Sequence, residues 1–256
     1  MIDLWLRSGL LGIIFIPFLV LYCIAAAIVW ITHLSPLRPF FISCIGITGP
    51  FFASVAVLFS LFAAFLANDV QHRAGEAQAA VLREADGIRT ILRLSEALGT
   101  PGVPLKAAVV GYGQSVLEKE WPRMQEGKLV DDLQAFRNLT RAVMAPELTA
   151  ATPPAVHQTI LSGLVEIRQA RRERFSLLAH VSDPVNWLGM LILGVATQFA
   201  IAVVQLERLR PQALALFVFT TAFAATAVLV GLAERPFTGK HITDDPLRAA
   251  IASAKE

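Results

Sequence analysis

The chain has 256 residues, of which 55% are hydrophobic, and its mean hydropathy of +0.59 is high for a soluble domain of this length. The net charge is only +2, and we expect no nucleic-acid partner. Cys23 and Cys44 are the only cysteines, and both lie in or beside apolar stretches, which excludes a secreted domain stabilised by a disulfide framework.

Long uncharged stretches predict membrane-spanning helices. Each is close to the ~20 residues that an α-helix needs to cross a bilayer. In chain order they cover residues 9–32, 46–67, 187–206 and 211–233. The first stretch is longer than the apolar core of a signal peptide, typically ~7–15 residues, so we expect it to remain as a span rather than to be cleaved.

The charged stretch between the second and third spans reads as soluble helix, so we predict an all-α integral membrane protein with four transmembrane helices and an inserted helical domain. The expected domains are residues 1–67 (spans one and two), 68–185 (a cytoplasmic helical domain), 186–233 (spans three and four) and 234–256 (a cytoplasmic C-terminal tail). Inside the inserted domain the patterns predict helices over residues 70–98, 105–120, 130–144 and 155–181.

The first of these helices follows span two without an intervening proline, so we expect one long helix that continues out of the membrane. Trp121-Pro122 predicts the end of the helix over 105–120, because proline cannot continue the backbone hydrogen bonding.

The distribution of Lys and Arg predicts the orientation of the chain. Four spans place both termini and residues 68–185 on one side of the membrane. Within about 15 residues of the spans, that side carries most of the basic residues, whereas the other side has only Arg38, Arg208 and Arg210. The positive-inside rule therefore predicts that both termini and the inserted domain are cytoplasmic.

Span two carries two distinct faces. One is a stripe of small residues, which lets helices approach closely: Ala53, Ala56, Ser60, Ala63 and Ala67. The other contains Phe51, Leu58, Phe62 and Phe65, and Asp69 continues it beyond Asn68. The span contains five phenylalanines, Phe51, Phe52, Phe59, Phe62 and Phe65. They either face lipid or fill the helix bundle, or part of the set forms a narrow hydrophobic constriction in an oligomeric pore. Helical periodicity separates the faces but does not say what they face.

No span carries an ionisable residue at mid-membrane depth, which argues against an ion-coupled pump. Gln198 in span three is the most polar deep side chain, and it either bonds neighbouring helices or lines a pore. The histidines are scattered without metal-ligand spacing, and phosphate-binding and nucleophile motifs are missing. We therefore expect no metal, no cofactor and no enzymatic activity.

A cluster of arginines marks the last helix of the inserted domain. Arg171 and Arg174 share a helical face with Ile167 and Leu178, and Arg172 lies between them. A buried arginine favours a carboxylate that accepts two hydrogen bonds, and the candidate partners are Glu76 and Glu120. The cluster is either a structural ion-pair network or an electropositive vestibule that concentrates anions.

These residues also carry a resemblance to a known family. The matching elements are Glu76 and Glu84, Glu120-Trp121-Pro122 with Met124 and Gly127, Arg171-Arg172-x-Arg174, and Pro236-Phe237-x-Gly239 with Ile242. In this order the chain resembles the bestrophin-like family of bacterial membrane proteins, from span two to the C-terminus. The resemblance implies a bacterial inner-membrane protein related to bestrophins, which are pentameric ion channels whose second span lines the pore. The acidic calcium-sensing cluster of animal bestrophins is absent.

The resulting hypothesis is a homo-oligomer, pentameric by resemblance, that is surrounded by membrane lipid and conducts small ions, anions in preference to cations. The candidate constriction residues are Phe51, Phe62 and Phe65, with Asn68 and Asp69 at the inner mouth. The alternative is a non-conducting scaffold whose cytoplasmic helices bind a partner, and it requires an exposed apolar patch around Trp121.

Overall fold

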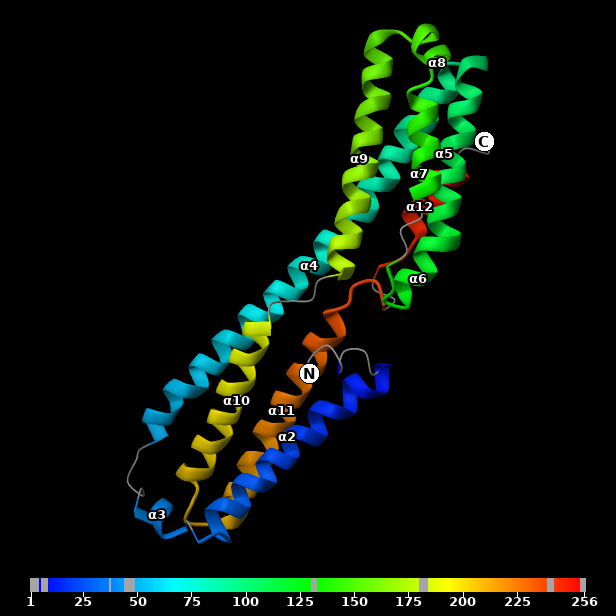
Figure 1. The fold of residues 1–256 in the computed structure, drawn as a ribbon. Coiled ribbons are helices and arrows are strands. Elements are labelled where there is room, and N and C mark those ends of the chain that lie inside the picture. The colour runs from blue at the N-terminus through cyan, green and yellow to red at the C-terminus, as the bar shows by residue number, and fades with distance from the viewer. Residues whose placement is uncertain are drawn as a thin grey trace. The chain divides into compact units, whose positions relative to one another are not determined.

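The structure is a computed structural model that describes residues 5, 9–36, 38–43, 49–129, 133–179, 184–238 and 242–253. Every regular element within these residues is helical, in agreement with the all-α prediction (Figure 1). The chain divides into two compact units. Unit 1 comprises Met1–His72 and Ser182–Glu234, and unit 2 comprises Arg73–Val181 and Arg235–Glu256.

One helix contributes to both units: α4 runs unbroken from Gly49 to Ala97, as the sequence predicts for span two and its continuation. The other helices of unit 1 are α2 (Gly9–His33), α3 (Arg38–Ser43), α10 (Pro184–Val204) and α11 (Leu209–Ala233). Those of unit 2 are η1 (Thr100–Gly102), α5 (Val103–Ser115), η2 (Val116–Glu120), α6 (Trp121–Gln125), α7 (Leu133–Val143), α8 (Pro146–Ala151), α9 (Pro154–Ala179) and α12 (Asp245–Ala252).

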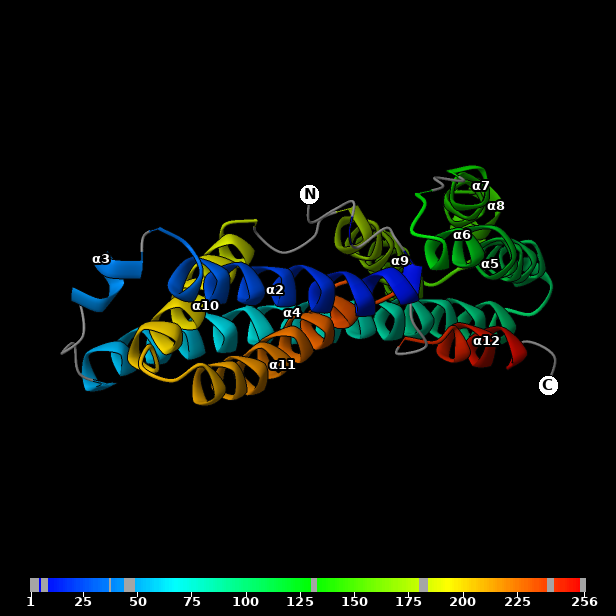
Figure 2. The same cartoon turned by 90° about the horizontal axis from the view of Figure 1, so that it is seen from below.

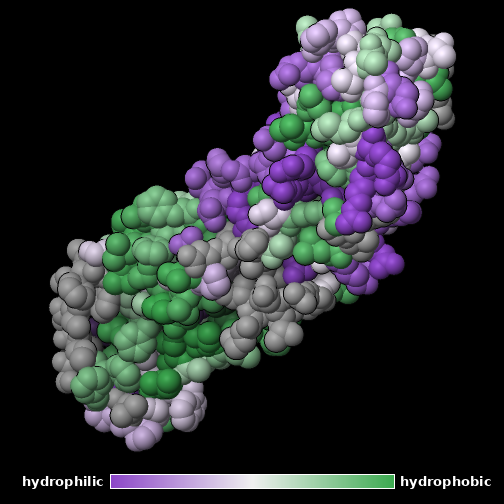
Figure 3. Space-filling model, turned by 45° about the horizontal axis from the view of Figure 1, so that its top comes forward, coloured by the Kyte–Doolittle hydropathy of each residue, from purple (hydrophilic) through white to green (hydrophobic). Residues whose placement is uncertain are grey.

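Four helical stretches are long and apolar enough to cross a membrane, judged by length and composition: Leu11–His33, Ala53–Ala97, Pro154–Val204 and Leu209–Ala233. The third stretch contains α9 and α10, and its uncharged part is α10. The surface of unit 1 is accordingly hydrophobic on the face drawn in Figure 3, whereas that of unit 2 is mostly hydrophilic. The four predicted apolar helices are therefore confirmed.

Unit 1 is a bundle in which α2 packs against both α10 and α11 (Figures 1 and 2). Its core contains Leu66, Trp187 and Phe223, all at most 1% exposed. Gly194 allows α10 to approach α11, because a Cβ atom at this position would lie 2.2 Å from the ring of Phe223. The close contact therefore depends on a missing side chain.

In unit 2, α9 runs antiparallel to α4. Arg83 of α4 pairs with Glu173, and further along α4 the backbones come close where Gly87 meets Gly163. A Cβ atom at Gly87 would lie 2.8 Å from the Cγ1 atom of Ile167. The two glycines let the helices pack closely enough to bury the residues between them.

The predicted break at Trp121-Pro122 is wrong. Helix α5 passes into a π-helical turn, η2, and then directly into α6, so the chain stays helical through Pro122. The amide N–H of Trp121 bonds the carbonyl of Val116, five residues earlier. The wider π turn moves away the carbonyl that the proline ring would otherwise meet, and Pro122 falls in the first turn of α6, where proline is tolerated.

The segment expected as a C-terminal tail contains α12, which packs in unit 2. Leu247 and Ala250 of α12 are fully buried. Ile251 fills a slot at Gly113 of α5, where a Cβ atom would lie 2.5 Å from its Cδ1 atom. Arg89 of α4 donates to the backbone carbonyl of Pro246 at 3.3 Å.

Candidate functional site

The apolar part of α4 packs on the rest of unit 1 along one narrow stripe. Ala63, Leu66 and Val70 are buried against α10 and α11. Phe59 also belongs to the bundle, since its ring lies 5.5 Å from that of Phe219 and 5.0 Å from that of Phe223. This phenylalanine therefore fills the bundle, which was one of the two alternatives for the set.

Two of the predicted constriction residues lie outside that stripe. Phe65 is 60% exposed, and Phe62 is 36% exposed with one edge of its ring against Gly189 of α10. Asn68 is exposed and Asp69 is half-buried. Phe51 lies in α4, but its side chain falls outside the described part of the chain.

Among the four apolar stretches, the one in α4 is the least covered by its own chain. Only 11% of it is buried, against 28% for the stretch in α2 and 39% for that in α11. A span that contacts so little of its own bundle leaves most of its surface for lipid or for other copies of the chain.

Polar side chains within unit 1 bond neighbouring helices. Gln198 is fully buried and donates to the hydroxyl of Thr220 at 2.8 Å and to the carbonyl of Leu21 at 3.4 Å. It therefore joins α10 to α11 and α2, the first of its two predicted roles. Gln212, near the start of α11, joins the same three helices by donating to the carbonyl of Ala202 at 2.7 Å and accepting from His33 at 2.7 Å.

Unit 2 holds a buried cluster of charges, which we call the charge cluster: Glu84, Glu120, Arg171 and Arg174. All four are at most 6% exposed. Arg171 Nη2 donates to Glu120 Oε1 at 2.6 Å. Arg174 Nη2 donates to Glu84 Oε1 at 2.9 Å and to Glu120 Oε2 at 3.3 Å, so the two carboxylates and two guanidiniums form one connected network.

Neutral groups complete this network. The hydroxyl of Tyr112 donates to Glu84, and Arg174 Nη1 contacts the sulfur of Met124 at 3.0 Å. The Arg171 guanidinium lies 4.7 Å from the ring centre of Phe175, a cation–π distance. The contacts join α4, α5, η2, α6 and α9, so the cluster connects most of the helices of unit 2.

Burial changes the acidity of the cluster. Burial and the adjacent charge of Glu84 raise the pKa of Tyr112 well above its usual range. Burial also raises the pKa of Glu120, although its hydrogen bond from Arg171 acts in the opposite direction. Burial alone would lower the pKa of Arg174, but the charges of Glu84, Tyr112 and Glu120 and the hydrogen bond to Glu84 together outweigh it and raise that pKa. Arg174 therefore stays charged, and its charge is neutralised by contact rather than by deprotonation.

The sequence identified part of this cluster. Glu120 contacts Arg171 and Arg174, as predicted, whereas Arg172 is exposed. Glu76 is half-buried, and the second carboxylate at Arg174 is Glu84, two turns further along α4. A signal for Glu84 does exist, because it interrupts the apolar stripe of α4 between Val81 and Ile88, where a charge requires a buried partner.

Of the residues expected to be structural, Trp121, Pro236 and Phe237 are buried in unit 2, whereas Pro122 is exposed. Trp121 is buried with its ring 6.1 Å from that of Phe237, edge to face, and Pro122 follows it in α6. Pro236 precedes Phe237, and Gly239 of the same motif lies outside the described residues. The part of the chain that the structure covers brings no group of three or more His, Cys, Asp or Glu residues together as metal ligands.

Comparison with known proteins identifies the family of the chain. The sequence profile of the Bestrophin-like domain matches residues 19–246. The chain belongs to the bestrophin-like family. Among the curated proteins, none is similar enough to this bestrophin-like chain to count as a match.

Solved structures share the fold of this bestrophin-like protein. A bacterial Bestrophin homolog from Klebsiella pneumoniae is 13% identical with a TM-score of 0.66, and the match covers 94% of this chain and 96% of that one. A variant of the same homolog gives 13% identity and a TM-score of 0.67 over 97% and 96% of the two chains. A further structure, described as a membrane protein, is 14% identical with a TM-score of 0.62, and the match covers 97% of this chain and 96% of that one. The bestrophin fold thus extends over nearly the whole chain.

Proposed function

We propose that this bestrophin-like protein assembles into a homo-oligomeric membrane channel that conducts small ions, with α4 of each copy around the pore. The observation that carries the proposal is the sparse covering of α4 by its own chain, together with the exposed rings of Phe62 and Phe65. In an oligomer whose α4 helices surround an axis, these rings would form a hydrophobic constriction that gates by dewetting. A pentamer is the proposed assembly, by relation to bestrophins.

The proposal includes a preference for anions over cations. Arg171 and Arg174 contribute little to a surface potential, because Glu84 and Glu120 neutralise them inside unit 2. The support comes instead from Arg168 and Arg172, which are exposed one turn apart on α9 and raise the local anion concentration. No enzymatic step is part of the proposal.

The scaffold alternative required an exposed apolar patch around Trp121. Trp121 is only 3% exposed and packs against Phe237. Its place in the core of unit 2 leaves that alternative without the surface feature that supported it.

The test is a recording from the purified protein in planar bilayers under asymmetric chloride salt. The informative variant is Phe65→Ala, and Phe15→Ala is the matched control, because Phe15 of α2 is 65% exposed and lies on a different span. We expect discrete currents whose reversal potential lies closer to the equilibrium potential of chloride than to that of the cation. Phe65→Ala should change the conductance or the open probability, and Phe15→Ala should change neither.

Three results would contradict parts of the proposal. A well-folded oligomer that stays silent across voltage and pH would rule out the channel. Equal effects of the two variants would remove α4 as the pore helix, and a reversal potential on the cation side would remove the anion preference. Native mass spectrometry of the same sample measures the copy number and tests the pentamer.

A further inference from the structure

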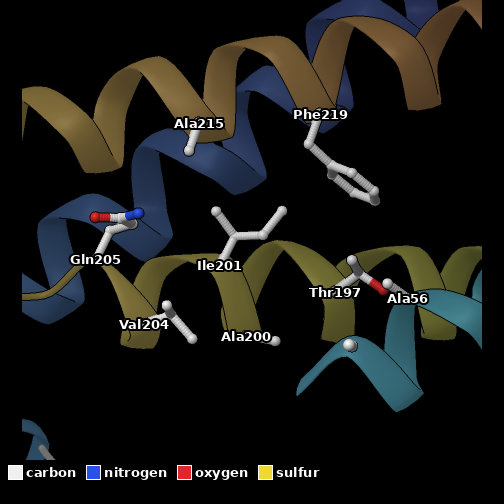
Figure 4. Close-up of a pocket in the computed structure, with 9 residues that line it drawn as sticks. Ala56, Thr197, Ala200, Ile201, Val204, Gln205, Ala215 and Phe219 are labelled. Carbon is white, nitrogen blue, oxygen red and sulfur yellow. The ribbon is translucent and has the colours of Figure 1, made fainter. Parts of the chain in front are cut away.

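Unit 1 contains a cavity of about 320 Å³ between α10, α11 and the start of α4 (Figure 4). Its walls include Ala56 of α4, Ala200 and Ile201 of α10, and Ala215 and Phe219 of α11. The volume falls within the ~300–1,000 Å³ range of small-molecule sites. The alanine side chains are too short to fill the space between the three helices, which is why the cavity forms.

The cavity is lined mostly by apolar residues, and only its Gln205 end, which we call the polar end, offers a polar side chain that is not already bonded within the described residues. Thr197 is among its few polar residues, and its hydroxyl is already bonded to the carbonyl of Leu193 at 2.8 Å. Figure 4 shows Gln205 at the opposite end of the row from Thr197 and Phe219. The side-chain amide of Gln205 is exposed and has no hydrogen-bond partner within the described residues. The amide is thus free to bond a ligand at the polar end.

Basic side chains lie beside that polar end. Gln205 begins the turn between α10 and α11, Arg208 ends that turn, and Arg210 lies in the first turn of α11. The backbone N–H of Arg208 bonds the carbonyl of Gln205 at 3.4 Å. Both arginines are exposed, and neither guanidinium has a partner in the described part of the chain. Across residues 205–210 the single acid is Glu207, so the two arginines leave a net charge of +1.

A third arginine belongs to the same end of unit 1. Arg38 begins α3, and the ring of Phe41 in α3 lies 5.8 Å from that of Phe199 in α10, so α3 lies beside this end of α10. Arg38 is also exposed and unpartnered among the described residues. Three exposed arginines therefore lie on segments that adjoin the Gln205 end of the cavity.

We infer that this cavity binds an anionic phospholipid, with the phosphate at Arg208 and Gln205 and an acyl chain between Ala200, Ala215 and Phe219. Lipid is the apolar molecule that surrounds membrane spans, and its charged head and apolar tail match the two ends of the cavity. Lipid tails are as apolar as the cavity walls, so the tail adds fit rather than selectivity. The arginines supply the selectivity for a negative headgroup.

The inference goes beyond the proposed channel and does not depend on it. The cavity faces the stripe of small residues on α4, whereas Phe62 and Phe65 lie on another face of that helix. Lipid binding can therefore be measured whether or not the protein conducts.

The experiment is native mass spectrometry of the full-length protein in detergent, incubated separately with dioleoyl-phosphatidylglycerol, dioleoyl-phosphatidylcholine and glycerol 1-phosphate. One variant, Arg208→Gln/Arg210→Gln, removes the charge, and its control is Arg93→Gln, an exposed arginine of unit 2. A second variant, Ala215→Leu, fills the cavity, and its control is Ala213→Leu, two residues away on the exposed side of α11.

The expected result is that phosphatidylglycerol binds more tightly than phosphatidylcholine, while glycerol 1-phosphate alone is not retained. Each arginine contributes roughly fivefold, so we expect the charge variant to weaken phosphatidylglycerol binding by at least about that factor. Ala215→Leu should also weaken it, and both controls should bind as the wild type does.

Specific outcomes would overturn the inference. Equal retention of the two lipids, or unchanged binding in the charge variant, would remove the headgroup site. Unchanged binding in Ala215→Leu, or equal retention of glycerol 1-phosphate, would show that no acyl chain occupies the cavity. Both variants replace residues that are not fully buried, so a folding defect would appear as a changed oligomer mass and is separated from loss of lipid.

Discussion

Arg174 is a fully buried guanidinium that contacts two carboxylates and a methionine sulfur. A buried ion pair gains little over an apolar pair of the same shape, because removing both charges from water costs several kcal/mol per ion. Breaking such a pair is a different matter, since the remaining charge stays buried without a counter-charge. The charge cluster therefore makes single substitutions costly even if its net contribution to stability is small.

We expect Arg174→Met to lower the free energy of unfolding by about 3–5 kcal/mol, because Glu84 and Glu120 lose their shared counter-charge. The double variant Glu84→Gln/Arg174→Met should cost less than the sum of its single changes. Urea unfolding followed by tryptophan fluorescence measures both. The control Arg172→Met alters an exposed neighbour and should change stability by no more than about 0.5 kcal/mol; an equal loss in the two arginine variants would contradict the role of the cluster.

Tyr112 makes the stability of the folded protein depend on pH in the alkaline range. Its pKa is raised in the folded protein, first by burial and then by Glu84, so the folded state holds the phenol proton more tightly than the unfolded state does. The corresponding stability is fully present below the unfolded pKa of about 10 and is lost as the pH rises toward the folded pKa. We expect the wild type to lose more stability than Tyr112→Phe between pH 9 and pH 11, measured as the shift of the urea midpoint; parallel midpoints would refute this.

The sequence predicted the Glu120 contacts of the charge cluster but not those of Glu84. Arg171 and Arg174 share one face with apolar residues, which shows that they need acidic partners. The partner of Arg174 is 90 positions away on α4, and helical periodicity carries no information about pairing over that distance. Only the packing of α9 on α4 decides it.

At the scale of single elements, α4 shows what helical periodicity can predict and what it cannot. The sequence separated a stripe of small residues from a stripe of phenylalanines, and both lie on one continuous helix. The buried stripe in the structure, Ala63, Leu66 and Val70, coincides with neither of them in full. Almost every residue in a membrane span is apolar, so hydropathy cannot tell the side that faces the protein from the side that faces lipid.

Helix α5 provides a matched pair of glycines. Gly111→Ala should raise the free energy of unfolding by up to about 1 kcal/mol, because the position is exposed, helical and has open space for a methyl group. Gly113→Ala should instead lower it by about 1–3 kcal/mol, since the new Cβ would lie 2.5 Å from Ile251 of α12. Urea unfolding of both variants measures the difference, and Ile251→Val should partly rescue Gly113→Ala. Equal effects of the two alanines would mean that α12 does not pack on α5.

The π turn of η2 could not be predicted from the sequence, because a hydrogen bond between residues five apart leaves no signature in composition. Pro122 therefore predicted a break that the wider turn avoids. The packing of α12 was missed for another reason. Its apolar residues Leu247, Ala250 and Ile251 are too few to indicate a core element until the slot at Gly113 is known.

At the scale of the whole molecule, composition was the most reliable guide. The four apolar helices were foreseen because the length and hydropathy that a bilayer requires can be read directly from the chain. The extent of unit 2 was not foreseen, since it also takes in Arg235–Glu256 from the far end of the sequence. Hydropathy marks where a chain enters a membrane but not which soluble segments pack together.

The proposed orientation, with both termini and residues 68–185 in the cytoplasm of a bacterial inner membrane, can be tested by cysteine labelling. In a Cys23→Ala/Cys44→Ala background, Arg93→Cys tests the inserted domain and Arg210→Cys tests the first turn of α11, next to the connection from α10. We expect a membrane-impermeant maleimide to label only Arg210→Cys in intact spheroplasts and both variants after lysis. Labelling of Arg93→Cys before lysis would reverse the orientation.

The antiparallel packing of α9 on α4 has a consequence for how the protein reaches its folded state. Arg174 lies opposite Glu84, and Gly163 meets Gly87. If α9 slid by one turn, Arg174 would face Ala80 or Ile88 and stay buried without a counter-charge, while side chains would clash where the glycines now meet. A shifted pairing of α9 and α4 is therefore unfavourable both electrostatically and sterically. The two contacts together select one register of the helices over its neighbours.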